Sequence, residues 1–332
     1  MKRSCFSDPL PGTLIATLLL LCTLAPVPAG AQDYPSKPIR LVVGYAPGGA
    51  WDILARQLAP RLSEVLNTQV VVDNRAGANA IIGLDYAAKA APDGYTLVLG
   101  GLTPLVLNSL TYPKLPYNAV TSFIGVSTIA TTSILFTVNP SVPTKSMREL
   151  VALAKARPGQ LNFATVGSGG STRVILELFM RTSGTNVKYV PYKAFAQGLT
   201  ELLGGMVDGM AIDFPVLYPS VKQGKLHALA ITSEKRNPLL PDVPTATEQG
   251  MPALTAGNWY ALLAPAKTPK PVVDKLYATL HKVVSSQDMK DTLMAGGVEP
   301  MLSPSLEAYS AYLAAELTRW GKVVKDANIV AD

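Results

Sequence analysis

The sequence has few of the residues on which nucleophilic catalysis and transition-metal binding most often depend. Among its 332 residues there are two cysteines, Cys5 and Cys22, and two histidines, His227 and His281. So few thiols and imidazoles argue against a Cys/His nucleophile and against a metal site ligated by cysteine and histidine. We therefore predict no catalytic residues, no metal site and no cofactor.

Charge is also scarce. Charged residues make up 16% of the chain, and the formal net charge is +6. An ordinary globular domain is about a quarter charged. The positive excess is spread along the chain rather than clustered, so it does not predict a nucleic-acid-binding surface, although it mildly favours anionic ligands.

The first 31 residues have the pattern of an export signal. Lys2 and Arg3 precede an apolar stretch at 14–24, and small residues at 29–31 form a cleavage site. We expect the mature chain to begin at Gln32 and to be a soluble, monomeric protein of the periplasm. Because both cysteines precede that point, we expect no disulfides.

Two alternatives concern the same segment. A retained membrane helix is disfavoured because the apolar stretch is too short to span a bilayer. A lipid anchor on Cys22 is disfavoured because a small residue usually precedes a lipidated cysteine, and Leu21 is large.

The rest of the chain alternates between strand and helix patterns. Removing residues 1–31 leaves 301 residues, which is long for one core and suits two lobes. The expected strands are 39–45, 69–73, 95–100, 161–166, 187–191, 207–213 and 226–232, and the expected helices are 51–67, 78–91, 147–157, 172–182, 195–203, 271–286, 288–295 and 305–327. Such alternation predicts parallel sheets with helices on both faces.

Two further apolar stretches are candidate crossings between the lobes. One is rich in Ile, Val and Thr and lies at 124–138, and the other is a return strand at 259–264. We predict that lobe 1 comprises 32–130 plus 254–332 and that lobe 2 comprises 131–253. The C-terminal helices are expected to pack back on lobe 1.

Two segments share the order strand, Gly-Gly loop, helix start. They are LVVGYAPGG at 41–49 and LNFATVGSGGS at 161–171. A helix N-terminus has unpaired N–H groups, and glycine lets the backbone approach a ligand, so each loop is a candidate site for a carboxylate or phosphate. A tight turn without a ligand is the alternative for either loop alone. Neither loop completes a nucleotide-binding motif, and Ser168 does not lie in a G-x-S-x-G elbow.

A series of short motifs runs along the whole chain. They are YPSKPIR at 34–40, APGG at 46–49 with Asp52, DNR at 73–75 with Gly77, APDGY at 91–95, YPKLPY at 112–117, VPYK at 190–193, LLGG at 202–205 with VD at 207–208, LLPDVPT at 239–245 and LLAPA at 262–266. Together they resemble the Bug family, the TctC-type substrate-binding proteins of tripartite tricarboxylate transporters.

The resemblance implies a type II periplasmic binding protein fold, in which two doubly wound α/β lobes are joined by crossing strands. It also implies a carboxylate ligand held between the two Gly-Gly loops. By position, it places Tyr45, Ala46, Pro47, Gly48, Gly49 and Asp52 in the first wall of the site, and Ser168, Gly169, Ser171 and Thr172 in the second.

At several positions the chain departs from the family pattern toward bulkier or aromatic residues. These departures are Ala50-Trp51, Ala78-Asn79-Ala80, Arg173, Ala194-Phe195 and Ile212-Asp213. We therefore add Trp51, Arg173, Phe195 and Asp213 to the ligand-binding candidates. Gly170, in the second Gly-Gly loop, and Thr103 are also candidates.

Each of these candidates has a purely structural alternative. Trp51 and Phe195 would then only pack lobe surfaces, and Arg173 would be a solvated helix charge. Asp52 would cap its helix or tie down its own loop, and Asp213 would be an ordinary residue at a strand end.

The combined prediction is an extracytoplasmic solute-binding protein that closes around a small organic acid by a hinge at the crossing strands. It would present the acid to a tripartite tricarboxylate-type transporter or to a sensor. The alternative function is a periplasmic hydrolase or lyase that uses the same cleft, and the lack of a nucleophile–base pair disfavours it.

Overall fold

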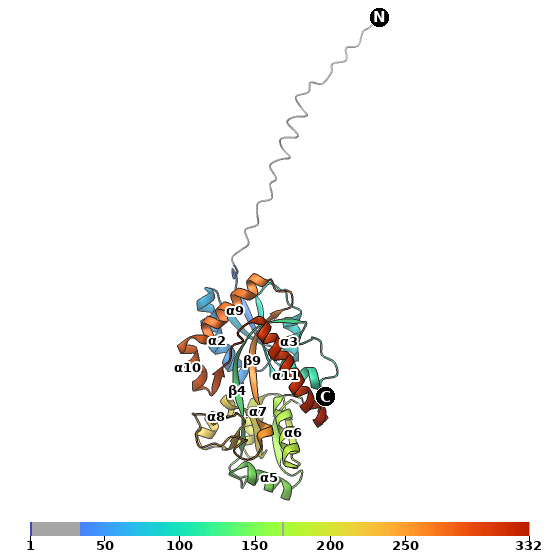
Figure 1. Ribbon diagram of the computed structural model, residues 1–332, viewed down its shortest axis with the longest axis vertical. Helices are drawn as coiled ribbons and strands as arrows, with labels where there is room; N and C mark the ends of the chain where they lie inside the picture. The colour runs from blue at the N-terminus through green and yellow to red at the C-terminus, as the bar shows by residue number, and fades with distance from the viewer. Residues whose placement is uncertain (2–33, 168, 332) are drawn as a thin grey trace. The chain divides into compact units, whose positions relative to one another are not determined.

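The computed structural model describes residue 1, residues 34–167 and residues 169–331 (Figure 1). The chain divides into two compact units, Met1–Ser36 and Lys37–Asp332, and the fold and the site belong to the second unit. Our predictions about the export signal, from Lys2 to cleavage before Gln32, lie outside the described residues. The prediction for Ser168 does so too.

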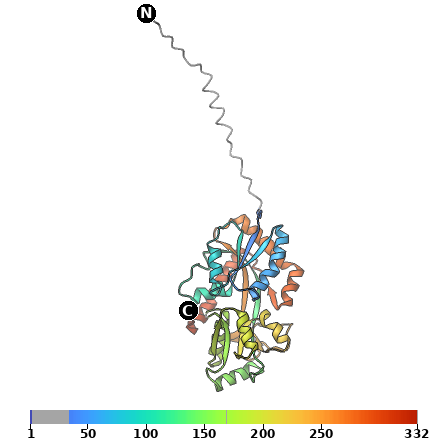
Figure 2. The ribbon, with the colours of Figure 1, turned by 180° about the vertical axis from the view of Figure 1, so that it is seen from behind.

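The second unit alternates strands and helices around one branched sheet (Figures 1 and 2). Its strands are β1 (Ile39–Val43), β2 (Val70–Asn74), β3 (Thr96–Gly101), β4 (Phe123–Val138), β5 (Asn162–Val166), β6 (Lys188–Tyr192), β7 (Gly209–Asp213), β8 (His227–Ile231), β9 (Gly257–Pro265) and β10 (Val298–Pro300). Its helices are α2 (Ala50–Leu66), α3 (Ile81–Ala88), the π-helix η1 (Leu102–Leu107), α4 (Asn108–Thr111), α5 (Met147–Ala156), α6 (Ser171–Ser183), α7 (Phe195–Leu203), α8 (Phe214–Lys222), the short 3₁₀ helix η2 (Pro252–Leu254), α9 (Lys270–Ser285), α10 (Gln287–Ala295) and α11 (Leu306–Ala327).

The sheet has two halves that share the long strand β4. In the first half, β2, β1 and β3 are parallel neighbours, and β9 runs antiparallel to both β3 and β4. In the second half, β6, β5 and β7 are parallel neighbours, and β7 and β8 run antiparallel to β4. The crossing stretch that we expected at 124–138 is therefore a single strand that passes from one half into the other.

The helices form where apolar residues recur at helical spacing. In α2, Leu54, Leu58 and Leu62 are buried on the face toward the core, as the four-residue spacing predicts. The Ser146 side chain caps α5 by accepting a hydrogen bond from the backbone N–H of Glu149, as the capping-box pattern predicts. The Glu149 carboxylate accepts its own hydrogen bond from the backbone N–H of Lys145.

The C-terminal helices contact the first half of the sheet. Helix α9 contacts α2 and β4, and α11 contacts β4 and η1. On α11, the buried Glu316 carboxylate accepts hydrogen bonds from the indole N–H groups of Trp259, 3.0 Å away, and Trp320, 3.1 Å away. The bond from Trp259 links α11 to strand β9, whereas Trp320 lies on α11 itself, one turn from Glu316.

Our prediction of a helix starting at residue 78 was wrong. Ala78, Asn79 and Ala80 have positive φ values of 47°, 51° and 72°, and α3 begins only at Ile81. Non-glycine residues rarely adopt this conformation, and three in succession form a tight left-handed turn rather than a helix. Segments η1, α4, α8, η2 and β10 were also not predicted: α4, η2 and β10 have only three or four residues, and η1 and α8 contain proline, which disfavours a helix prediction. Within the described ranges, no helix combines the length and apolar character needed to cross a bilayer.

Candidate functional site

The first Gly-Gly loop is held in shape by Asp52. The Asp52 carboxylate accepts hydrogen bonds from the Gly48 backbone N–H at 2.9 Å, the Arg56 side chain at 2.8 Å and the Asn74 side chain at 3.0 Å. Burial alone would raise the pKa of Asp52, but these three bonds hold it below its ordinary value. Asp52 thus ties down its own loop, which was the alternative we gave for it, and Gly48 supplies the positive φ of 86° that the turn requires.

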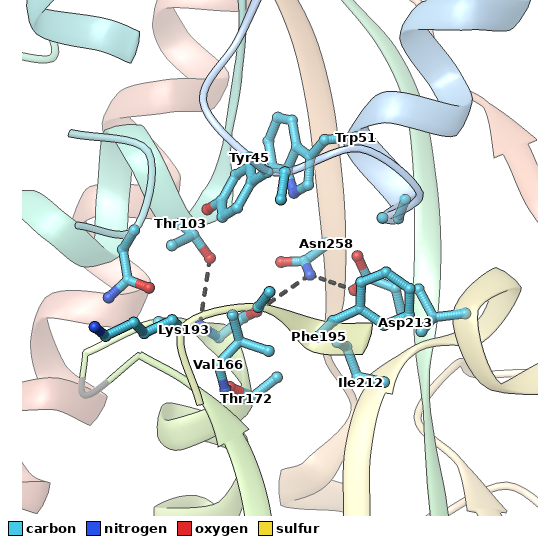
Figure 3. A pocket seen from close by; sticks show the side chains of 18 residues that line it. Tyr45, Trp51, Thr103, Val166, Thr172, Lys193, Phe195, Ile212, Asp213 and Asn258 are labelled. Atoms are coloured by element: carbon cyan, nitrogen blue, oxygen red, sulfur yellow. Dashed lines mark hydrogen bonds between the residues drawn. The ribbon is translucent and has the colours of Figure 1, made fainter. Parts of the chain in front are cut away.

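The second Gly-Gly loop has the same construction in the other half of the sheet. Gly170 is the N-cap of α6, and the Thr172 hydroxyl accepts a hydrogen bond of 2.9 Å from the backbone N–H of Val166. The backbone N–H of Ser171 donates to the Thr103 hydroxyl at 3.3 Å (Figure 3). Because Thr103 belongs to η1, which follows β3, this bond links the second loop to the first half of the sheet.

The two helix N-termini face one cavity. Together with the open solvent at its mouth, the cavity has about 640 Å³ of space that is not filled by protein atoms. Ten of the predicted site residues line it: Tyr45, Ala46, Gly49, Trp51, Thr103, Gly170, Ser171, Thr172, Phe195 and Asp213. The lining also includes residues that we did not select: Ala50, Asn79, Val166, Lys193, Ala194, Ile212, Val216 and Asn258.

Four described candidates besides Asp52 do not line this cavity: Pro47, Gly48, Gly169 and Arg173. The Arg173 guanidinium instead pairs with Glu177 and lies 3.4 Å from the ring centre of Tyr189. Gly169 faces away from the cavity, since a side chain there would meet Ala331 and Thr111. The geometry thus gives no direct ligand contact to Arg173.

Aromatic rings form one wall of the cavity. The Tyr45 and Trp51 rings stack with centroids 5.2 Å apart, and the Trp51 ring meets the edge of Tyr260 at 4.7 Å. Burial raises the pKa of both tyrosines, so their hydroxyls are protonated donors. From the other half of the sheet, the Phe195 ring lies over Gly49, where an added Cβ would be 3.6 Å from it. Trp51 and Phe195, two of the positions at which the chain departs from the family pattern, thus both place rings in the cavity lining.

A polar and buried group adjoins this aromatic wall through Tyr260. Asp213 accepts hydrogen bonds from the Asn258 amide and, at 2.9 Å, from the Tyr260 hydroxyl (Figure 3). Both Asp213 and Asn258 are at most 4% exposed. Burial raises the pKa of Asp213 to about 6, although the two hydrogen bonds oppose that rise.

Asp213 gives the folded protein a specific pH dependence. Its raised pKa means that the folded state binds this proton more tightly than the unfolded chain, so its contribution to stability falls as the pH rises through about 6. We expect wild type to lose about 1 kcal/mol of unfolding free energy between pH 5 and pH 7 relative to Asp213→Asn, as measured by urea unfolding. Parallel pH profiles for the two proteins would contradict a raised pKa at Asp213.

The residues that we missed had weak signals in the sequence. Asn258 directly precedes the expected strand 259–264, and nothing local shows that this end of the strand reaches a cavity. Asn79 lies in the turn that departs from the family pattern, which was the one available signal. Neither histidine lines the cavity, and the described residues contain no cluster of three or more His, Cys, Asp or Glu side chains that could hold a metal ion.

Comparison with known proteins decides the family. The model of the TctC family, described as the tripartite tricarboxylate transporter family receptor, matches residues 54–329. The chain belongs to the TctC family. Protein BugT of Bordetella pertussis is 34% identical to it over 300 residues, which are 90% of this chain and 92% of BugT.

Solved structures of similar proteins confirm the predicted fold. The structure of R. palustris Rpa4515 with adipate has a TM-score of 0.86 at 34% identity and covers 90% of this chain and 99% of its own. MatC (Rpa3494) from Rhodopseudomonas palustris with bound malate has a TM-score of 0.82 at 28% identity and covers 88% of this chain and 100% of its own. This TctC family member therefore has the type II periplasmic binding protein fold, and it is a solute-binding receptor rather than an enzyme.

Proposed function

We propose that this TctC family member binds a small organic acid in the cavity between the two halves of its sheet. The supporting observation is that the first turns of α2 and α6, each preceded by a Gly-Gly loop, line one cavity. Helix N-termini stabilise anions through free N–H groups and the helix dipole. Adipate and malate are bound in the two solved relatives, and both are carboxylates.

The remaining parts of the proposal follow from this site. The ligand carboxylate would contact the backbone of both loops, so binding would draw the two halves together about β4 and β9. We assign lobe 1 to 32–130 plus 254–332 and lobe 2 to 131–253. The protein would act as a monomer in the periplasm after export and would deliver its ligand to the membrane subunits of a tripartite transporter or to a sensor kinase.

Different cavity residues would contact different parts of the ligand. Gly49, Gly170, Ser171 and Thr172 would offer backbone or hydroxyl donors to the carboxylate, with Thr103 and Tyr45 beside them. Trp51 and Phe195 would cover the apolar part of the ligand. Asp52 would act indirectly, by holding the Gly48 turn.

A thermal-shift screen of organic acids tests this proposal. A ligand at about 100 times its Kd stabilises the folded state by about 2.7 kcal/mol, which should raise the melting temperature by roughly 5–10 °C. Native mass spectrometry of the freshly purified protein would identify any acid that co-purifies. If mono-, di- and aromatic carboxylates and amino acids all leave the melting temperature unchanged, carboxylate binding is ruled out.

A further inference from the structure

The orientation of the Asn258 side-chain amide is determined by its neighbours. Its nitrogen donates one hydrogen bond to Asp213 and another, of 3.2 Å, to the Ser171 hydroxyl (Figure 3). An amide nitrogen has two hydrogens, so these two bonds use both of them. The opposite orientation would set the amide oxygen against the Asp213 carboxylate, which is an acceptor when ionised.

The Asn258 amide oxygen, by contrast, has no hydrogen-bond partner among the described residues, although it is buried. Asn258 as a whole is 2% exposed and lines the cavity. In Figure 3 the oxygen points away from Asp213, into the space below Trp51. Buried polar atoms in proteins nearly always have a partner, so an acceptor without one on a residue that lines the cavity indicates a donor on the ligand.

Asp213 determines which kind of group can lie beside this oxygen. Within the described part of the chain, Asp213 forms no ion pair, and its hydrogen bonds come from the neutral side chains of Asn258 and Tyr260. A second carboxylate of the ligand would meet the Asn258 oxygen and the Asp213 charge, both of which repel it. A hydroxyl or ammonium group would be a donor to the oxygen, and an ammonium would also be attracted to the charge.

We propose that the ligand of this protein is a monocarboxylic acid with a hydrogen-bond donor, a hydroxyl or an ammonium group, that binds the side-chain oxygen of Asn258. This inference rests on the proposed function, because the helix N-termini must hold the carboxylate of the same ligand, and Asn258 contacts Ser171 at the start of α6. Asn258 is then the residue that selects hydroxy acids or amino acids over dicarboxylic acids.

Matched acids test the inference on the wild-type protein. The panel contains hydroxy and amino acids of three to six carbons with the donor at each position from C2 to the terminal carbon, the acids in which a methyl replaces the donor, and the dicarboxylic acids in which a carboxylate replaces it. Calorimetry should show the best donor acid binding about a hundredfold more tightly than its methyl and carboxylate counterparts. Comparing the hydroxy acids with the amino acids shows which donor is used. If either binds more tightly than its methyl and carboxylate counterparts, the inference is supported.

The same panel distinguishes failure of this inference from failure of the proposed carboxylate binding. If a dicarboxylic or alkanoic acid binds as tightly as the best donor acid, the inference is wrong while carboxylate binding stands. If no acid in the panel or in the wider screen binds, the proposed function fails and the inference fails with it.

A variant assigns the selectivity to Asn258. Asn258→Leu should reduce the preference for the donor acid over its methyl counterpart from about a hundredfold to about tenfold or less. The control is Asn186→Leu, at an exposed position outside the cavity, which should retain the wild-type preference. A full preference in a folded Asn258→Leu protein would overturn the assignment, and if that variant does not fold, the wild-type panel alone decides.

Discussion

Gly170→Val is expected to weaken ligand binding by about a hundredfold or more, while the protein still folds. Gly170 has φ −83° and ψ −179°, which valine adopts without strain. Its Cβ, however, would lie 3.2 Å from the Val166 carbonyl oxygen, 3.4 Å from the Asn79 side chain and 3.6 Å from the Thr103 methyl. Only the contact with the Val166 oxygen is tight for the Cβ itself, but the two γ-methyl groups of valine need further space, and because Asn79 and Thr103 line the cavity, either the loop shifts or the cavity narrows. A hundredfold loss corresponds to about 2.7 kcal/mol of binding free energy.

The measurement is isothermal titration calorimetry with an acid identified by the screen, combined with urea unfolding. Gly49→Val is the companion variant in the first loop, where the new side chain would meet the Phe195 ring. Gly204→Val is the control, because Gly204 is exposed, has an ordinary φ of −78° and lies outside the cavity. Unchanged affinity in both Gly49→Val and Gly170→Val would place the ligand somewhere else.

Trp51→Ala is expected to lower both stability and affinity. The Trp51 side chain is only 6% exposed and packs between Tyr45 and Tyr260, with its far edge close to Gly101. Removing a buried tryptophan leaves a cavity that typically costs about 3–5 kcal/mol of unfolding free energy. Because the same ring forms part of the wall of the ligand cavity, its loss should also weaken ligand binding by about tenfold or more.

Two measurements separate the roles of Trp51. Urea unfolding reports the packing contribution, and calorimetry at a temperature where the variant is folded reports the binding contribution. Trp51→Phe keeps a ring in place and should retain most of the stability. If Trp51→Ala loses stability but binds the acid normally, Trp51 serves packing alone, which was the alternative reading of this residue.

Much of the architecture could be predicted from local patterns. The Leu54–Leu58–Leu62 spacing predicts α2, and the apolar stretch at 124–138 predicts β4. The two segments in which a Gly-Gly loop joins a strand to a helix predict two loops that can bind an anion. These features are local, because a helix or strand depends on periodicity over a few residues. The departures at Trp51, Phe195 and Asp213 also identify cavity positions, since each lies within or next to a motif of the family.

What only the tertiary structure decides is which residues from distant segments meet at the site. Asn258 lies 45 residues from Asp213 and 87 from Ser171, yet it contacts both side chains because β9 pairs with β4 beside β7. The direction of each side chain also depends on packing that no local pattern records. Arg173 turns to Glu177 and Tyr189, and Gly169 faces Ala331, although both lie in the second loop region. The sequence by itself thus determined the family, the fold and the two Gly-Gly loops. The polar part of the cavity, by contrast, depends on strand pairing between distant segments. Neighbouring residues of a strand point to opposite faces of the sheet, so only the register of the pairing decides which side chain faces the cavity.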